Sequence, residues 1–178
     1  MSMRRVLAVI CFSVFAVSAL WSADPVQSSG SAEKRKKAVK EMSNGNWRDA
    51  YNIYEEILLK DEVDPKFASD DLVRAVQCAR NLGELGKFDS FVENVLARHS
   101  SNWRVLVQGA REYSNTEHYG FRIAGAFERG GHRGGGEMVN SVERDRVRAL
   151  QLYDQAMPLV AKDSTADEQF SYYMEFAG

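Results

Sequence analysis

Residues 45–58 read GNWRDAYNIYEEIL, and this stretch decides the fold. Its apolar side chains recur three and four residues apart, which is the spacing of one face of an α-helix. These side chains are Trp47, Ala50, Tyr51, Tyr54, Ile57 and Leu58. The Asn44-Gly45 pair in front of them interrupts the helical pattern. The stretch therefore predicts an amphipathic helix that follows a tight turn.

Residues 86–96, GKFDSFVENVL, repeat this arrangement 41 residues later. A glycine, an aromatic residue two positions on and a packing residue three further on are typical of the second half of a tetratricopeptide-type unit. The offset exceeds the usual spacing of about 34 residues, and Phe91 stands where a small residue is expected. The pattern therefore predicts a degenerate tetratricopeptide-like array, with an ordinary helical bundle as the alternative.

Helical spacing of apolar residues continues through most of the chain. Further helices are predicted around residues 32–44, 69–82, 103–113, 141–157 and 165–176. The expected N-caps are Ser69 or Asp70 for the second of these and Asn140 for the fourth, where Glu143 completes a capping box. Pro158 is expected to bend or end that helix. The predicted fold class is all-α: antiparallel helix pairs over residues 32–178, with one Gly-rich irregular insertion.

The two last helices carry a more detailed prediction. Val147, Leu150, Tyr153 and Met157 are expected to line the inner face of the helix 141–157, and the pairs Glu143–Arg146 and Asp145–Arg148 its solvent side. Phe170, Tyr173 and Phe176 give the last helix aromatic side chains that need a further partner. This suggests that the chain is a truncated fragment.

Residues 114–138 break the helical pattern. Residues 118–127 fit a short strand or an irregular helix, and five of the chain's 13 glycines fall in residues 130–136. The candidate binding loop here comprises Arg129, His132, Arg133, Gly134, Gly135 and Gly136. Three interpretations stay open for it: a structural connector beneath the helices, a partner-binding loop, or an anion site on backbone N–H groups.

Signals for catalysis are weak throughout. Neither nucleotide-binding glycine motif is present, and no nucleophile motif occurs. The histidines lack metal-ligand spacing, so a zinc site from His118, His132 and Glu128 or Glu137 is the weakest alternative. We therefore expect a non-catalytic protein without cofactor or metal.

Residues 1–23 have the composition of a secretory signal peptide. Arg4 and Arg5 precede a mostly apolar stretch, 6–20, and small residues follow at Ala19 and Ala23. That stretch is shorter than the roughly 20 residues of a membrane-spanning helix. We therefore predict cleavage, export to the periplasm or the exterior, and no membrane span afterwards, with an uncleaved anchor as the alternative.

The segment after the signal peptide is predicted to be a polar linker, 24–31. The basic run Lys34–Lys37 is interpreted as a solvated helix face, with contact to anionic lipid or nucleic acid as the alternative. The formal net charge of −2 gives no indication of nucleic-acid binding. Cys78, the only cysteine beyond the signal, lies on an apolar helical stripe and is predicted to be buried.

One block of the sequence resembles a known family. It comprises HYGF (118–121), IAG (123–125), FERG (127–130), HRGGG (132–136), ERDRVRALQL (143–152) and AMPL (156–159), with NWR (102–104) upstream. This block resembles the region after the signal peptide in a group of large bacterial alpha-2-macroglobulin-like proteins. The resemblance implies an exported protein whose helical N-terminal region precedes domains that trap proteases. Some members of that family contain a thioester between a cysteine and a glutamine three residues on. Here Asn81 stands three residues after Cys78, so this thioester is not possible.

We therefore expect an exported, non-catalytic interaction segment of such a protease-trapping protein. The alternative is a stand-alone periplasmic tetratricopeptide-like adaptor that binds a peptide in a groove. Both predict a protein or peptide partner and no nucleic acid. The sequence indicates neither the partner's identity nor the oligomeric state.

Overall fold

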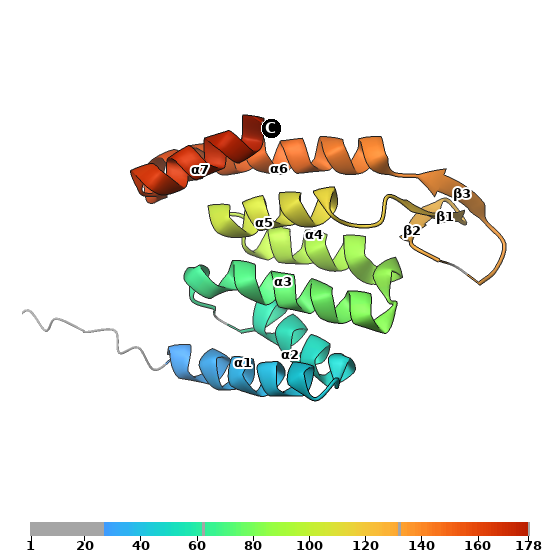
Figure 1. The fold of residues 1–178 in the computed structure, drawn as a ribbon, viewed down its shortest axis with the longest axis horizontal. Coiled ribbons are helices and arrows are strands. Elements are labelled where there is room, and N and C mark those ends of the chain that lie inside the picture. Colours follow the sequence, from blue (N-terminus) through green and yellow to red (C-terminus); the bar gives the residue numbers. More distant parts are fainter. Residues whose placement is uncertain (1–26, 62, 132, 178) are drawn as a thin grey trace, which may run out of the picture.

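The computed structural model describes residues 27–61, 63–131 and 133–177, so the predicted signal peptide, 1–23, lies outside this part. The helices are α1 (Gln27–Ser43), α2 (Trp47–Leu59), α3 (Pro65–Leu82), α4 (Phe88–Arg98), α5 (Trp103–Ser114), α6 (Val142–Asp163) and α7 (Ala166–Ala177), with a 3-10 turn, η1 (Leu85–Lys87), before α4. They stack from α1 at one end to α6 and α7 at the other (Figure 1).

Three short strands are inserted between α5 and α6: β1 (Tyr119–Ile123), β2 (Ala126–Arg129) and β3 (Glu137–Asn140). They form an antiparallel sheet in the order β2-β1-β3, beside one end of the stack (Figure 1). Ala124 and Gly125 both have positive φ and form the two-residue turn between β1 and β2. The mostly helical prediction is confirmed, but the all-α fold class is wrong, because the fold also contains a small sheet. Of the two predictions for residues 118–127, the short strand is confirmed, in β1 and β2.

The ends of the helices correct several expectations. The first helix begins at Gln27, so part of the expected linker is helical, and α3 begins at Pro65 rather than near Ser69 or Asp70. Asp64 is the N-cap of α3, and its carboxylate accepts the N–H of Lys66.

Around α6 the expected capping box is absent. Ser141 is the N-cap, while the side chain of Asn140 accepts the N–H of Val142. The helix continues through Pro158, which lies on its exposed side. Water can therefore hydrate the carbonyl group that lost its N–H partner, and the helix continues to Asp163. The capping box that begins α7 does form, between Thr165 and Glu168.

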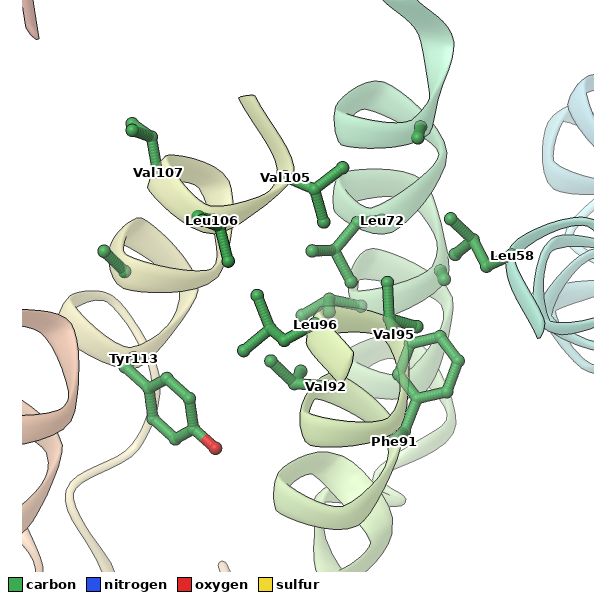
Figure 2. Close-up of a cluster of buried hydrophobic side chains, with 14 of the residues drawn as sticks. Leu58, Leu72, Phe91, Val92, Val95, Leu96, Val105, Leu106, Val107 and Tyr113 are labelled. Atoms are coloured by element: carbon green, nitrogen blue, oxygen red, sulfur yellow. The ribbon is translucent and has the colours of Figure 1, made fainter. Parts of the chain in front are cut away.

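The hydrophobic core runs through the whole stack, from Ala38 of α1 to Tyr172 of α7, and its central part lies between α2 and α5. Figure 2 shows side chains from these helices interdigitating, with Leu72 of α3 between Leu58 of α2 and Val105 of α5. The two repeated segments bury equivalent residues: Ala50 and Phe91, and Tyr54 and Val95.

The first aromatic residue of each repeated segment and Cys78 differ in their burial. Phe88 is buried, but its counterpart Trp47 is only partly buried. Cys78 is fully buried, as predicted, and burial raises the pKa of its thiol to about 11.

Candidate protein-binding surface

The predicted binding loop joins β2 to β3. Arg133 and Gly134 to Gly136 are exposed, and His132 lies outside the described residues. A Cβ atom added at Gly135 would meet nothing within 4 Å. The interpretation as a connector packed beneath the helices is therefore wrong for this part of the loop.

Arg129 does not belong to the exposed loop, because only 2% of its surface is exposed. Its guanidinium group makes two hydrogen bonds to Asp89 of α4, at 2.9 and 3.0 Å, and two to Asp145 of α6, at 2.8 and 2.9 Å. It also donates to the backbone carbonyl of Glu117 at 2.5 Å. The rings of Phe88 and Phe127 lie 5.0 and 5.5 Å from it. Arg129 therefore joins the sheet to two helices.

Asp145 is the second member of this buried cluster, although the sequence placed it on the solvent side of its helix. It is fully buried, and it accepts hydrogen bonds from Arg129, Ser141, His118 and Arg144. Burial alone would raise the pKa of Asp145, but these hydrogen bonds outweigh it and hold the pKa well below its usual value. The cluster is a structural junction, because Arg129 and Asp145 are inaccessible to solvent.

The predicted inner face of α6 is also partly wrong. Tyr153 is buried, but Val147 and Leu150 are about half exposed. The inner face consists of Ala149, Leu152, Tyr153, Ala156 and Val160. Small residues let α6 approach α5 closely, and this leaves larger apolar residues on the outside.

Helix α7 is apolar on two opposite faces. Tyr172 is buried on the inner face, and its partly buried neighbour Phe176 packs on the same core. Phe170 and Met174 lie on the opposite face, at 67% and 61% exposure, with Tyr173 beside them. Large apolar side chains that are exposed on one helix face commonly mark a contact with another protein. The outer face of α7 is therefore the strongest candidate for contact with another protein.

Two ion pairs fix which face of α7 points outward. Arg104 and Arg111, seven residues apart on α5, contact Glu168 and Glu175, seven residues apart on α7, at 2.6 Å and 2.5 Å respectively. Hydrogen bonds from Arg111 and from Tyr153 lower the pKa of Glu175. Because both glutamates are held toward α5, the apolar residues Phe170 and Met174 are directed away from the stack.

A hollow of about 450 Å³ adjoins these helices. Most of its lining residues lie in the N-terminal half of α6 and at the C-terminal end of α7. Figure 1 shows that α7 ends partway along α6. The walls of the hollow combine apolar and polar side chains. They comprise Ser114, His118, Val142, Arg146, Ala149, Leu150, Tyr153, Glu175, Phe176 and Ala177. We call the hollow and the exposed apolar residues of α6 and α7 the α6–α7 face.

Apolar exposure is concentrated on this face. Six of the eleven large apolar side chains that are exposed in the described part of the chain belong to α6 or α7. They are Val142, Val147, Leu150, Phe170, Tyr173 and Met174. Sequence spacing indicated the aromatic residues of α7, but it could not show which of them face outward.

Other candidate features from the sequence are used internally. In the basic run, Lys34 pairs with Glu56 and Asp61, and Arg35 pairs with Asp71, so half of it holds the helices together. His118, one of the residues considered for a zinc site, contacts Asp145 through Nδ1. Across residues 27–61, 63–131 and 133–177, no group of three or more His, Cys, Asp or Glu side chains is arranged to hold a metal ion. In the same ranges, no helix combines the length and apolar character needed to cross a membrane.

Comparison with protein-family models, with curated proteins and with solved structures finds no match for this chain.

Proposed function

We propose that this chain is an exported, non-catalytic helical segment that binds another protein through its α6–α7 face. The observation that carries the proposal is the second apolar face of α7. Burying exposed apolar surface is favourable by about 25 cal/mol per Å², so covering Phe170 and Met174 makes the free energy of association more favourable. Contiguous apolar patches on a folded surface commonly mark protein contacts.

The partner depends on whether the chain is a segment of an alpha-2-macroglobulin-like protein or a stand-alone adaptor. If the chain corresponds to the N-terminal region of an alpha-2-macroglobulin-like protein, the partner is a following domain of the same protease-trapping assembly. If it is a stand-alone periplasmic adaptor, the partner is a separate protein or peptide. The sequence repeat of α2 and α4, together with the ring contact of Tyr51 and Phe91 at 5.4 Å, supports a tetratricopeptide-like array in both cases.

Site-specific photo-crosslinking tests the contact. A photoreactive amino acid replaces Tyr173 on α7 or, as a matched control, Val73 on α3, which has similar exposure. We expect a single covalent adduct of defined mass from position 173 and none from position 73. The additional substitution Phe170→Ser should remove the adduct. Absence of any adduct at position 173, or the same adducts from both positions, would overturn the proposal.

Export is tested separately by N-terminal sequencing of the protein from the culture medium or periplasm. The proposal expects a new N-terminus between Leu20 and Asp24. An intact Met1 on periplasmic protein would contradict it.

A further inference from the structure

We infer that the hollow of the α6–α7 face receives a segment of the partner protein that carries both apolar side chains and carboxylates. The inference rests on the proposed function, because it specifies the chemistry of the partner. It starts from Arg146, the one cation in the wall of the hollow that has no ion pair or hydrogen bond to the described residues.

The other charged groups around the hollow are already satisfied. Glu175 accepts hydrogen bonds from Arg111 at 2.5 and 2.6 Å and from the Tyr153 hydroxyl at 2.7 Å. His118 has Asp145 at 3.0 Å from Nδ1 and the carbonyl of Ser114 at 3.3 Å from Nε2. Arg146 therefore supplies the uncompensated charge of the hollow.

The apolar walls determine the second property of the occupant. Val142, Ala149 and Leu150 of α6 and Phe176 of α7 present carbon atoms to the hollow. An apolar segment that covers these residues would also remove water from Arg146, which is costly unless the segment supplies an anion. A carboxylate can accept two parallel hydrogen bonds from a guanidinium group. The combination selects an acidic amphipathic segment over a purely apolar or a basic one.

The geometry also favours a polypeptide segment over a small molecule. Val142, Arg146, Ala149 and Tyr153 are spaced three and four residues apart and form one line along α6. Helix α7 follows the same line farther along, where the rings of Tyr153 and Phe176 stack at 5.4 Å. A segment in the hollow would lie end to end with α7 and repeat its packing on α6.

Two fluorescent synthetic peptides provide the test. Both carry leucines at helical spacing, and they differ only in their flanking residues, which are glutamate in one and lysine in the other. We expect the glutamate peptide to bind the purified protein about three- to tenfold more tightly, as for charge pairs at the rim of an interface. Arg146→Glu should reverse the order, because the hollow then carries a negative charge that favours the lysine peptide. The variant should still fold, because position 146 is in the first turns of α6, where a carboxylate is compatible with the helix.

Control variants separate the hollow from general effects. Lys37→Glu makes the same charge change on α1, at the far end of the stack, and should leave both affinities unchanged. Leu150→Asn should weaken both peptides, and circular dichroism checks that each variant remains folded. The inference is overturned if neither peptide binds, or if Arg146→Glu leaves their order unchanged.

Two further measurements address other occupants. Decanoate offers an apolar chain and a carboxylate without a peptide; if it competes at the same concentration as the glutamate peptide, a small amphiphile replaces the partner segment. Sedimentation of the protein alone detects a second copy: a dimer that Leu150→Asn disrupts would also overturn the inference. Crosslinking from position 173 reports on the outer face of α7 and the peptides report on the hollow, so the two proposals fail separately.

Discussion

Helices α2 and α7 have nearly equal lengths, 13 and 12 residues, but their apolar residues have different surroundings. Helix α2 packs against α1 and α3, and none of its large apolar side chains is exposed. Helix α7 buries one residue, Tyr172, and exposes three large apolar side chains. Their aromatic content is similar, so position in the stack makes the difference. An inner helix is covered by its own chain, whereas three large apolar side chains of α7 remain exposed.

The largest expected effect comes from the buried junction that joins the sheet to α4 and α6. Arg129→Met should lower the free energy of unfolding by about 3–5 kcal/mol, because it removes the buried cation between Asp89 and Asp145 and leaves the partly exposed Arg144 as the cation that they share. Urea denaturation measures this change. Arg133→Met in the exposed loop is the control and should change the free energy by less than about 0.5 kcal/mol. Equal effects of the two substitutions would show that the cluster does not stabilise the fold.

A pair of truncations compares the two helices directly. Ile57 of α2 is fully buried, so Ile57→Ala should cost about 2–5 kcal/mol through lost burial and a residual cavity. Met174→Ala on the outer face of α7 should cost less than about 0.5 kcal/mol in the isolated protein. Thermal melts of both variants measure the difference. A large loss from Met174→Ala would mean that the outer face is already covered in the free protein.

Substitutions of two glycines, one in β1 and one in the exposed loop, should differ in their effect on stability. A Cβ atom at Gly120 would lie 2.1 Å from the carbonyl oxygen of Glu128 and 2.8 Å from the ring of Phe127. Gly120→Ala should therefore cost about 1–3 kcal/mol, as for overpacking elsewhere. At Gly131 nothing lies within 4 Å, so Gly131→Ala serves as the control. If both variants unfold at the same urea concentration, the close strand pairing at Gly120 does not constrain this position.

Much of the helical stack could be predicted from the sequence, because its apolar residues recur at helical spacing. The helix ends were less predictable: Asp64 and Ser141 cap their helices, whereas Asp70 and Asn140 match the sequence rule equally well. A short strand was one of two predictions for residues 118–127, but the three-stranded sheet was not predicted, because its strands have only four or five residues. Strand pairing joins residues distant in sequence, and spacing within one segment does not contain that information.

The site shows the same limit. The aromatic residues of α7 indicated a further partner, but the hollow depends on where α7 ends relative to α6, which no local pattern specifies. Arg129 and Asp145 were assigned to exposed positions because charged residues are rarely buried without a partner. Arg129 and Asp145 lie 16 residues apart in the sequence, and Asp89 lies 40 residues from Arg129. Only the tertiary structure brings these charges together.

The smallest effect is expected from pH, and its sign differs between the regions. The hydrogen bonds that lower the pKa of Asp145 stabilise the fold above the usual value of 3.8, and this contribution is lost as the pH falls below it. Inside the stack, burial raises the pKa of Asp71 despite its bonds to Arg35. The folded state therefore takes up a proton at Asp71 before the unfolded chain does, which adds stability on acidification.

Opposite changes are therefore expected when each carboxylate is removed. Asp145→Asn should be less stable at pH 7, but it should lose less stability than the unmodified protein between pH 5 and 3. Asp71→Asn should lose more over the same interval, because the compensating proton uptake is gone. Urea denaturation at pH 7, 5, 4 and 3 measures both slopes, with exposed Asp167→Asn as the control. Parallel slopes for all four proteins would show that neither buried carboxylate determines the acid stability, and that the junction and the stack interior respond to pH alike.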